Sequence, residues 1–359
     1  MPQQKEQQRS SILFLIGNGF DLGLNMKTSY ADVYETYVKT PSKSEVIQNF
    51  KNELSKRKPL DKWSDFEMGM ADYAKTLSNE SELIECVRDF KSHMVEHLQA
   101  ENDKMLSLIK SCDNVYKIFR ELNKSFTEFY SSLTPNDQAK LNQVIGKFSH
   151  AKLNIITFNY TTVLDELIAL KSKFNDDQLP LGFLWSIGEI SKPLHIHGIL
   201  NQAVVLGVDN AEQLQNSTYK LSKRGSRAFV KTYFNQNYDD GKVLQAKKLI
   251  AESSVICTYG FSMGESDKTW VDLLIEWLKD SPDHHLIVYQ YDQKSYHQYA
   301  FEEIMNDEDD KKEILFQYLK LTDPNLLEQI HIPIGYDIFN FNFIRVKAHT
   351  PPTPKIMSE

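Results

Sequence analysis

The sequence predicts an α/β fold in which a mostly parallel sheet carries helices on both faces and one large helical insertion. Short apolar runs of strand length recur along the chain. Segments with helical periodicity follow or precede these runs. Residues 45–150 interrupt this alternation, which predicts the insertion. A chain of 359 residues is too long for one small core and corresponds to roughly two domains.

Five runs have the character of buried strands. Residues 11–17 are mostly apolar and end at a glycine, as is typical of a strand that is covered on both faces. The other four predicted strands are 153–158, 203–207, 253–259 and 285–291. Helical patterns follow Asn159 and Gly264, and a third pattern, 242–252, leads into the strand at 253. Because parallel neighbours need a crossover connection, this alternation favours a parallel sheet.

The region 45–150 contains no convincing strand. It carries two apolar stripes at helical spacing, from Leu83 to Leu98 and from Met105 to Leu122. No polar cluster in it resembles a site, so we expect this region to govern control or partner binding and not chemistry. We therefore divide the chain into residues 1–44 as the first part of the α/β domain, 45–150 as the helical insertion, 151–348 as the rest of that domain and 349–359 as a disordered tail.

Composition excludes several classes of function. A net charge of −8 argues against a general nucleic-acid binder, which would carry a basic field. Three cysteines without a C-x-x-C pair argue against a disulfide framework and a Cys-rich zinc module. No apolar stretch approaches the length of a membrane span, and none resembles a signal peptide. We expect a soluble cytoplasmic protein that does not contact the membrane.

Four polar clusters follow predicted strands, at the edge of a parallel sheet where ligands bind. The first is the glycine turn Gly17–Gly23. It allows a phosphate to approach the backbone closely and to meet the N–H groups at the start of the next helix. Its spacing, G-x-G-x-x-x-G, is one residue longer than the dinucleotide fingerprint, and the usual acidic residue about 20 positions later is missing. The alternative is a tight turn in which Asp21 caps the helix or interacts with its dipole.

The second cluster, Thr157–Thr161, contains Asn159. An asparagine side chain donates and accepts hydrogen bonds, which suits it to hold a ribose hydroxyl or a water molecule. Alternatively, Asn159 is the N-cap of the helix that begins near Thr161.

The third cluster contains His195 and His197, which share one face of a short strand. A metal site would need a third ligand, and none is evident, so we expect no metal. One imidazole is then packed in the core and the other faces the cleft. We favour His197 for the cleft because Gly198 gives it the more open backbone.

The fourth cluster, Gly260–Asp267, lies between a strand and a helix, which favours an anion or ribose site. Its alternative is a capped turn, with Ser266 or Gly264 as the cap and Asp267 in the first helical turn. Smaller candidates are the segment 207–209 and the basic run 220–231. The basic run is either solvated surface or a phosphate clamp formed by Arg224 and Arg227.

The motifs GNGFDLGLNMKTSY, WSDFE (63–67), TFNYT, HIHG, LGVD and GFSMGESD occur in this order, and together they resemble the AbiH family of bacteriophage abortive-infection proteins. The match spans roughly residues 12–270. That family is in turn similar to a distant branch of the sirtuin-like Rossmann fold. The resemblance implies a Rossmann-like sheet. It also implies that His197 is catalytic, that Asn159 corresponds to the asparagine that lines the NAD pocket of sirtuin-like proteins, and that Gly260 and Ser262 form a ribose-binding turn. The nucleotide-binding residues that we predict in addition are Gly17, Asn18, Gly19, Phe20, Asp21, Thr157, Asp209 and Asp267.

The departures from sirtuins narrow the implied activity. The four-cysteine zinc module and the arginine after the glycine loop are missing, which argues against protein deacylation. Sirtuin-like proteins of phage defence hydrolyse NAD, so the resemblance implies an NAD+ nucleosidase. His197 would be its general base, Asn159 would position water or ribose, and the pyrophosphate would lie on Gly17–Gly19. The resemblance assigns no role to Asp21.

Two alternatives to NAD hydrolysis stay open. One is a hydrolase or transferase that acts on another nucleotide. The other is a non-catalytic nucleotide-sensing module of a defence complex. In each case we expect the chain to form a homo-oligomer or to bind a partner protein of a defence system.

Overall fold

The computed structural model describes residues 11–56, 63–145, 150–170, 186–214, 219–238, 240–290, 301–333, 338–341 and 344. Its centre is a seven-stranded sheet, and all pairings between its named strands are parallel. The strand order is β3 (Ser186–Ile190), β2 (His150–Thr157), β1 (Ser11–Ile16), β5 (Val255–Tyr259), β6 (His285–Tyr289) and β7 (Ile330–His331), and β4 (Leu194–His195) also pairs with β2. The predicted α/β fold with a parallel sheet is confirmed.

Strand β1 occupies the middle of the sheet, between β2 and β5. All six of its residues are buried. Its side chains alternate between two hydrophobic cores, with Phe14 and Ile16 in one and Leu13 and Leu15 in the other. Both faces of β1 are therefore dry, which explains why its sequence is a continuous apolar run.

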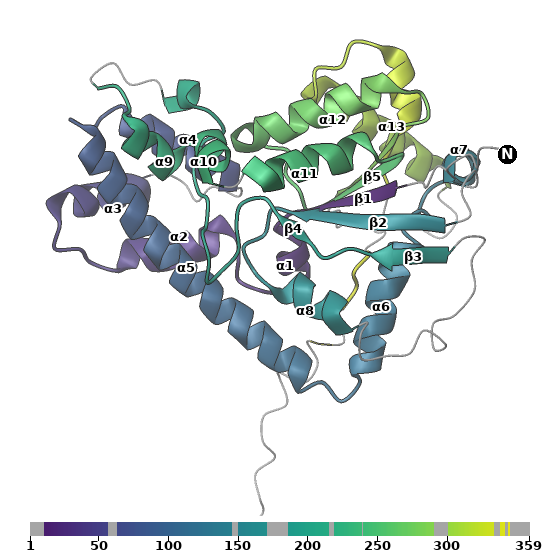
Figure 1. Ribbon diagram of the computed structural model, residues 1–359, viewed down its shortest axis with the longest axis horizontal. Coiled ribbons are helices and arrows are strands. Elements are labelled where there is room, and N and C mark those ends of the chain that lie inside the picture. Colours follow the sequence, from purple (N-terminus) through teal and green to yellow (C-terminus); the bar gives the residue numbers. More distant parts are fainter. Residues whose placement is uncertain are drawn as a thin grey trace, which may run out of the picture.

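Helices cover both faces of the sheet (Figure 1). The core on one face includes residues of α11 (Asp240–Ala251), α12 (Lys268–Asp280) and α13 (Phe301–Tyr318). The core on the other face includes residues of α1 (Gly19–Gly23), α6 (Val115–Thr127), α7 (Pro135–Ile145) and α8 (Val163–Ala169).

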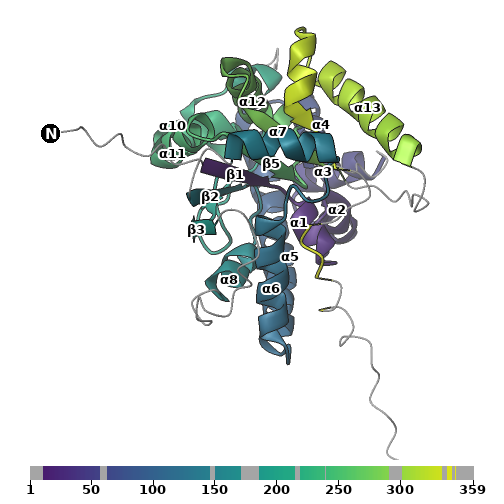
Figure 2. The same cartoon turned by 90° about the vertical axis from the view of Figure 1, so that its right-hand side faces the viewer.

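A separate group of helices lies beside one end of the sheet, on the left of Figure 1, and has its own core. It comprises α2 (Tyr30–Lys39), α3 (Glu45–Lys56), α4 (Trp63–Ala74), α9 (Lys223–Phe229) and α10 (Lys231–Tyr238). Helix α5 (Glu80–Lys110) belongs to two cores, because Leu83 packs in the helical core and Ile109 packs under the sheet. Figure 1 shows α5 and α6 diverging from the turn that joins them, although they overlap in the view of Figure 2. Between β1 and β2, the described residues contain only helices.

The structure corrects two of the predicted elements. Residues 203–207 are not a strand of the sheet. They form a single bridge, between Gly198 and Val204, and their apolar side chains pack in the helical core. The stripe from Met105 to Leu122 is divided between α5 and α6, because the side chain of Asn114 accepts a hydrogen bond from the backbone N–H of Lys117 and starts a new helix. The predicted disordered tail, 349–359, lies outside the described residues.

In the part of the chain that the structure describes, no helix is both long enough and apolar enough to cross a membrane.

The loops that follow β1 and β5 touch through glycine backbone. Gly17 N–H donates to Tyr259 O at 2.9 Å, and Gly19 N–H donates to Gly260 O at 3.1 Å. A Cβ atom on Gly17 would lie 2.3 Å from Gly260 O, and one on Gly19 would lie 2.4 Å from Gly260 Cα. Gly260 itself has a φ of +62°, which favours glycine. The contact between the two loops therefore requires glycine on both sides.

We predict that Gly19→Ala lowers the free energy of unfolding by about 2 kcal/mol or more, because the added methyl group overlaps the backbone of Gly260. The matched control is Gly23→Ala in the same short helix, where a Cβ meets the Tyr259 hydroxyl at an ordinary 3.5 Å. Urea unfolding of both variants measures the difference. Equal stability of the two variants would show that the two loops move apart to accommodate the methyl group without loss of stability.

Candidate functional site

The strands that carry the polar clusters end at the same level of the sheet. Ile16, the last residue of β1, lies opposite Thr157 of β2 and Tyr259 of β5. Thr157 in turn lies opposite His195 of β4. The segments that follow these four strands therefore meet at the carboxyl edge. The strand order runs from β1 toward β2 on one side and toward β5 on the other, as at the ligand-binding switch point of open α/β sheets.

A cavity of about 220 Å³ opens at this edge. Nine of the predicted site residues line it, namely Gly17, Asn18, Gly19, Asp21, Asn159, His197, Gly260, Ser262 and Asp267.

Three predicted residues do not line the cavity, because each side chain is engaged elsewhere. Phe20 is buried in the core below the sheet, with its ring 5.4 Å from that of Phe339. The Thr157 hydroxyl donates to Ile16 O at 3.1 Å. Asp209 accepts from the Thr269 hydroxyl at 2.8 Å.

The two histidines of the HIHG motif have separate surroundings. His195 contacts Asn159 O through Nδ1 and Asp165 Oδ2 through Nε2, both at 2.9 Å, so its ring supports the backbone of Asn159 from outside the cavity. His197 lines the cavity. Of the two, His197 is therefore the histidine that a ligand in this cavity would meet.

A buried charge network stands behind His197. Its Nε2 lies 3.1 Å from Asp267 Oδ1, although the angle is outside hydrogen-bond geometry. The same oxygen accepts from Lys231 Nζ at 2.9 Å, and Lys231 also donates to Glu67 Oε2 at 2.8 Å. The third contact of this ammonium is the Ser266 carbonyl oxygen, at 3.0 Å. Glu67 is fixed in turn, because its other oxygen accepts from Gly207 N–H at 2.9 Å.

Burial and ion pairing shift the pKa values of this network in opposite directions. Burial alone would raise the pKa of Asp267, but Lys231 and His197 hold it below its usual range. Burial would lower the pKa of Lys231, yet Asp267 and Glu67 raise it. The pKa of Glu67 is raised, mainly by burial and partly by Asp267, against the opposing effect of Lys231. Lys231 therefore keeps its charge, and Asp267 is the more strongly ionised carboxylate.

Asp21 and Asn159 present polar atoms that the protein does not satisfy. Asp21 is 1% exposed and Asn159 is 5% exposed. One carboxylate oxygen of Asp21 accepts from the Thr161 hydroxyl at 2.8 Å, whereas the other has no hydrogen-bond partner. Neither polar atom of the Asn159 side chain has a partner. Buried groups of this kind are costly unless a ligand or water satisfies them, so they mark a binding site.

The helix-capping alternatives have different outcomes. Gly264 is the N-cap of the short 3-10 helix Glu265–Asp267, with Asp267 in its first turn, and Asp21 lies in the first turn of α1. Asn159, in contrast, does not cap α8. The amide of Thr162, where α8 begins, donates to Asn102 of α5 at 2.8 Å and not to Asn159. Asp21 accepts from Thr161 across the cavity edge. The N-terminus of α12 has no side-chain cap, although Asp267 occupies the capping position.

Burial raises the pKa of Asp21 from 3.8 to about 7. Hydrogen bonding from Thr161, the nearby Asn159 amide and the charge of His195 act in the opposite direction. At neutral pH this carboxyl group therefore holds its proton about half of the time.

Aromatic rings line another side of the cavity. Phe158 and Phe261 stack with their centroids 4.2 Å apart, and the His197 ring lies edge-on to Phe158 at 5.3 Å. Tyr160 is also in the lining, and its hydroxyl donates to Val205 O at 2.9 Å. These faces suit a planar ring of a ligand.

The glycine turn differs from the expected phosphate cradle. The N–H groups of Gly17 and Gly19 donate to the β5 loop, and that of Phe20 donates to Gly17 O at 3.0 Å. The Asn18 side chain is tied to Thr28 by two hydrogen bonds, of 2.8 and 2.9 Å. Three of the backbone donors that the turn could offer to a phosphate, those of Gly17, Gly19 and Phe20, are therefore engaged within the protein.

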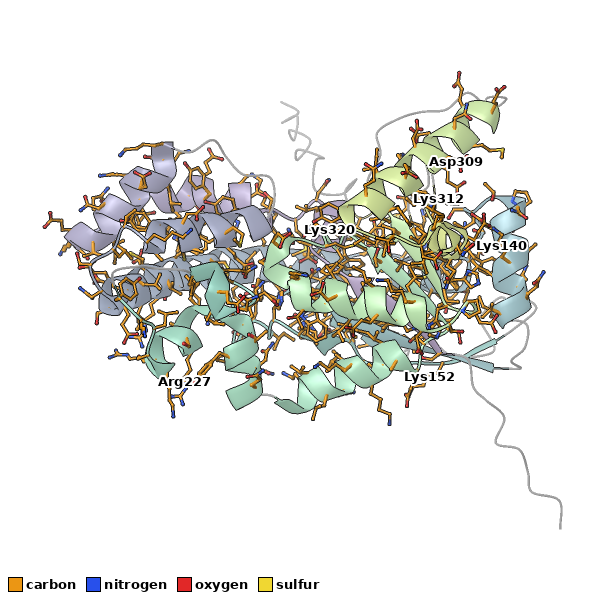
Figure 3. All side chains as sticks on the ribbon, turned by 90° about the horizontal axis from the view of Figure 1, so that it is seen from above. Lys140, Lys152, Arg227, Asp309, Lys312 and Lys320 are labelled. Carbon is orange, nitrogen blue, oxygen red and sulfur yellow. The ribbon has the colours of Figure 1, made fainter. Side chains whose placement is uncertain are left out.

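The basic run divides between the surface and the site. Arg224 and Arg227 are exposed and do not line the cavity, and Figure 3 shows Arg227 projecting from α9 at the edge of the molecule. Lys231 is buried and lies at the centre of the charge network. The predicted phosphate clamp is therefore absent from the cavity lining, and the last lysine of the run is the one that reaches the cavity.

Sequence reasoning missed Glu67 and Lys231. Glu67 closes the WSDFE motif and lies between the apolar residues Phe66 and Met68 of α4, which was an available signal. The helical region was expected to contribute no chemistry. Instead, it supplies Glu67 and Leu98 to the lining, because α4 and α5 reach over the carboxyl edge of the sheet.

We predict that Asp21→Asn changes the pH dependence of stability. The folded pKa lies above the unfolded one, so the protonated carboxyl stabilises the fold fully below about pH 4, and this contribution is lost as pH rises to about 7. The wild-type free energy of unfolding should therefore fall, relative to Asp21→Asn, by on the order of 2–4 kcal/mol between pH 4 and pH 8.

Urea unfolding at both pH values measures this difference, with Asp72→Asn on the surface as the control. Parallel pH profiles for wild type and Asp21→Asn would contradict the buried, proton-holding state of Asp21.

We predict that Lys231→Met destabilises the protein by about 3–5 kcal/mol, because it leaves two buried carboxyl groups without their cation. Adding Glu67→Gln should restore part of the loss, since it removes one of the two carboxylates. Thermal unfolding of both variants tests this. A loss below about 1 kcal/mol for Lys231→Met would show that the network is solvated.

A model of the AbiH family, described as bacteriophage abortive infection, matches residues 13–291. This range runs from β1 to the end of β6, and it contains every segment that lines the cavity. Among curated proteins, no match was found. The family match covers well over half of the chain and confirms the resemblance that the motifs indicated. The chain belongs to the AbiH family of bacteriophage abortive-infection proteins.

Proposed function

We propose that this chain acts in abortive infection as an enzyme that hydrolyses NAD+ at the bond between nicotinamide and ribose. The observation that carries the proposal is the convergence of His197, Asn159 and Asp21 on one buried cavity in which the last two have unpartnered polar atoms. The sirtuin-like resemblance of the same segments supports NAD as the substrate. The stacked rings of Phe158 and Phe261 offer an aromatic surface to the nicotinamide.

The reaction needs a stabilised cation and an activated water. The bond from ribose C1′ to the nicotinamide nitrogen breaks, and its electron pair leaves with nicotinamide. Positive charge then develops on C1′ and the ring oxygen. Water adds to C1′ and gives up a proton, so the products are nicotinamide, ADP-ribose and one proton. Asn159, which has a free donor and a free acceptor, orients the water or the ribose.

His197 takes the proton in this scheme. Its Nε2 lies beside Asp267, so Nδ1 is the nitrogen that we assign to proton transfer. With both carboxyls ionised, Glu67, Asp267 and Lys231 carry one net negative charge, and an imidazolium at His197 would neutralise it. In this scheme the negative charge of the network lies beside the imidazolium that general-base catalysis produces.

An enzyme that removes cellular NAD must be held inactive until infection. We therefore include control by self-association or by a defence-system partner in the proposal, and we place this control on the helical group α2–α5. That group lies beside the cavity and lends it Glu67 and Leu98.

We predict that His197→Ala and Asn159→Ala each lower kcat by at least about a hundredfold. The measurement is the release of nicotinamide from NAD+ by the purified protein, with ATP and other nucleotides assayed in parallel. His93→Ala, on the exterior of α5, is the control and should retain activity. Circular dichroism and unfolding curves verify that each variant is folded.

The outcomes separate the alternatives. Loss of activity in His195→Ala, with activity retained in His197→Ala, would reverse the assignment of the base. Tight binding of a nucleotide without turnover, in the presence of candidate partners, would replace the enzyme with a nucleotide sensor. Release of a different base or of phosphate would replace NAD by another nucleotide.

A further inference from the structure

The lining of the cavity contains more carboxyl groups than lysine or arginine side chains. Three carboxyl groups belong to it, those of Asp21, Glu67 and Asp267, and Lys231 is the one cation among the described residues that line it. All three hydrogens of that ammonium are engaged, with Glu67, Asp267 and the Ser266 carbonyl. An anion in the cavity would therefore meet carboxylates and no available lysine.

Three backbone donors of the glycine turn are already engaged within the protein. The N–H groups of Gly17, Gly19 and Phe20 donate to carbonyl oxygens within the protein. The cavity is also small: its volume of about 220 Å³ lies below the roughly 300–1,000 Å³ of pockets that enclose drug-sized ligands. A volume of this size holds only part of a dinucleotide, and the described lining offers a diphosphate no available lysine or arginine.

One carboxyl group of the lining forms no ion pair with a lysine or arginine among the described residues, although His195 is near enough to lower its pKa. Asp21 is 1% exposed, accepts from the Thr161 hydroxyl and has a second oxygen without a partner. The Asn159 amide beside it is unpartnered as well. A desolvated carboxylate that lacks one partner attracts a cation strongly, because little water screens the interaction.

We propose that the cavity selects the positively charged N-glycosyl end of its substrate, a pyridinium joined to ribose, with Asp21 as the counter-ion and the phosphates held outside. This inference rests on the proposed hydrolysis and adds what the cavity recognises. It also gives Asp21 a role in the reaction, because the same carboxylate opposes the positive charge that moves onto the ribose as the glycosidic bond breaks.

The test compares two small probes that differ in ring charge and carry no glycosidic bond. They are 1-methylnicotinamide, a cation, and its neutral 1,4-dihydro form. We expect wild type at pH 8 to bind the cation at least tenfold more tightly, as measured by NMR titration. In Asp21→Asn the preference should fall below threefold. Asp72→Asn, on the exposed surface of α4, should retain it.

The pH adds a second arm that uses the unaltered protein. Because burial raises the pKa of Asp21 to about 7, the preference of wild type should shrink at least threefold from pH 8 to pH 6. The other titratable groups that face this region are Glu67, Asp267, Lys231, His195 and His197. Comparison with Asp21→Asn over the same range separates Asp21 from all of them.

Equal affinity for the two probes, failure of the cation to bind, or an unchanged preference in Asp21→Asn would overturn the inference. Release of nicotinamide from NAD+ without any charge preference would overturn it too, while the hydrolysis proposal would stand. A charge preference without hydrolysis would support a cation-selective cavity and reject the NAD+ hydrolase.

Discussion

The ammonium group of Lys231 joins three segments that are far apart in the sequence. It bonds Glu67 of α4, Asp267 at the start of α12 and the carbonyl of Ser266, and all of these groups are buried. A charge this deep is tolerated only when its partners are fixed. The ammonium therefore couples the helical group to the edge of the sheet, and the position of His197 depends on that coupling through Asp267.

The polar groups at the carboxyl edge are of two kinds. Those with hydrogen-bond partners support the structure, and those without partners mark the candidate site. His195 uses both ring nitrogens to hold Asn159 O and Asp165, which fixes the backbone from which the Asn159 side chain projects. The side chain itself, like one oxygen of Asp21, has no partner. Leaving such groups dry costs stability, of the order of 1–3 kcal/mol for each neutral group. Such a loss of stability is tolerated at a binding site, because a bound ligand supplies the missing hydrogen bonds.

The sequence predicted the interior of the sheet well and its margins poorly. Strands β1, β2, β5 and β6 are buried, so their apolar runs stand out, whereas β4 and β7 have two residues each and give no pattern. Residues 203–207 resembled a strand because packing against helices produces a similar apolar run.

The site divides in the same way. Residues that directly follow strands, such as Asn159 and His197, were predictable because parallel strands end together. The pairing of Glu67 with Lys231 spans 164 positions, and no local pattern encodes such a contact. Similarly, Phe20 and Thr157 are adjacent to site residues in sequence but point into the core and the sheet, since side-chain direction depends on tertiary packing.

Helix α5 gives the molecule a mechanical linkage. With 31 residues it is about 46 Å long, and it is anchored at one end in the helical core and at the other beneath the sheet. Between the two anchors, Leu98 borders the cavity and Asn102 holds the amide at which α8 begins. Helix α5 also packs against α2 and α3, so one continuous helix connects these two helices with the border of the cavity at Leu98.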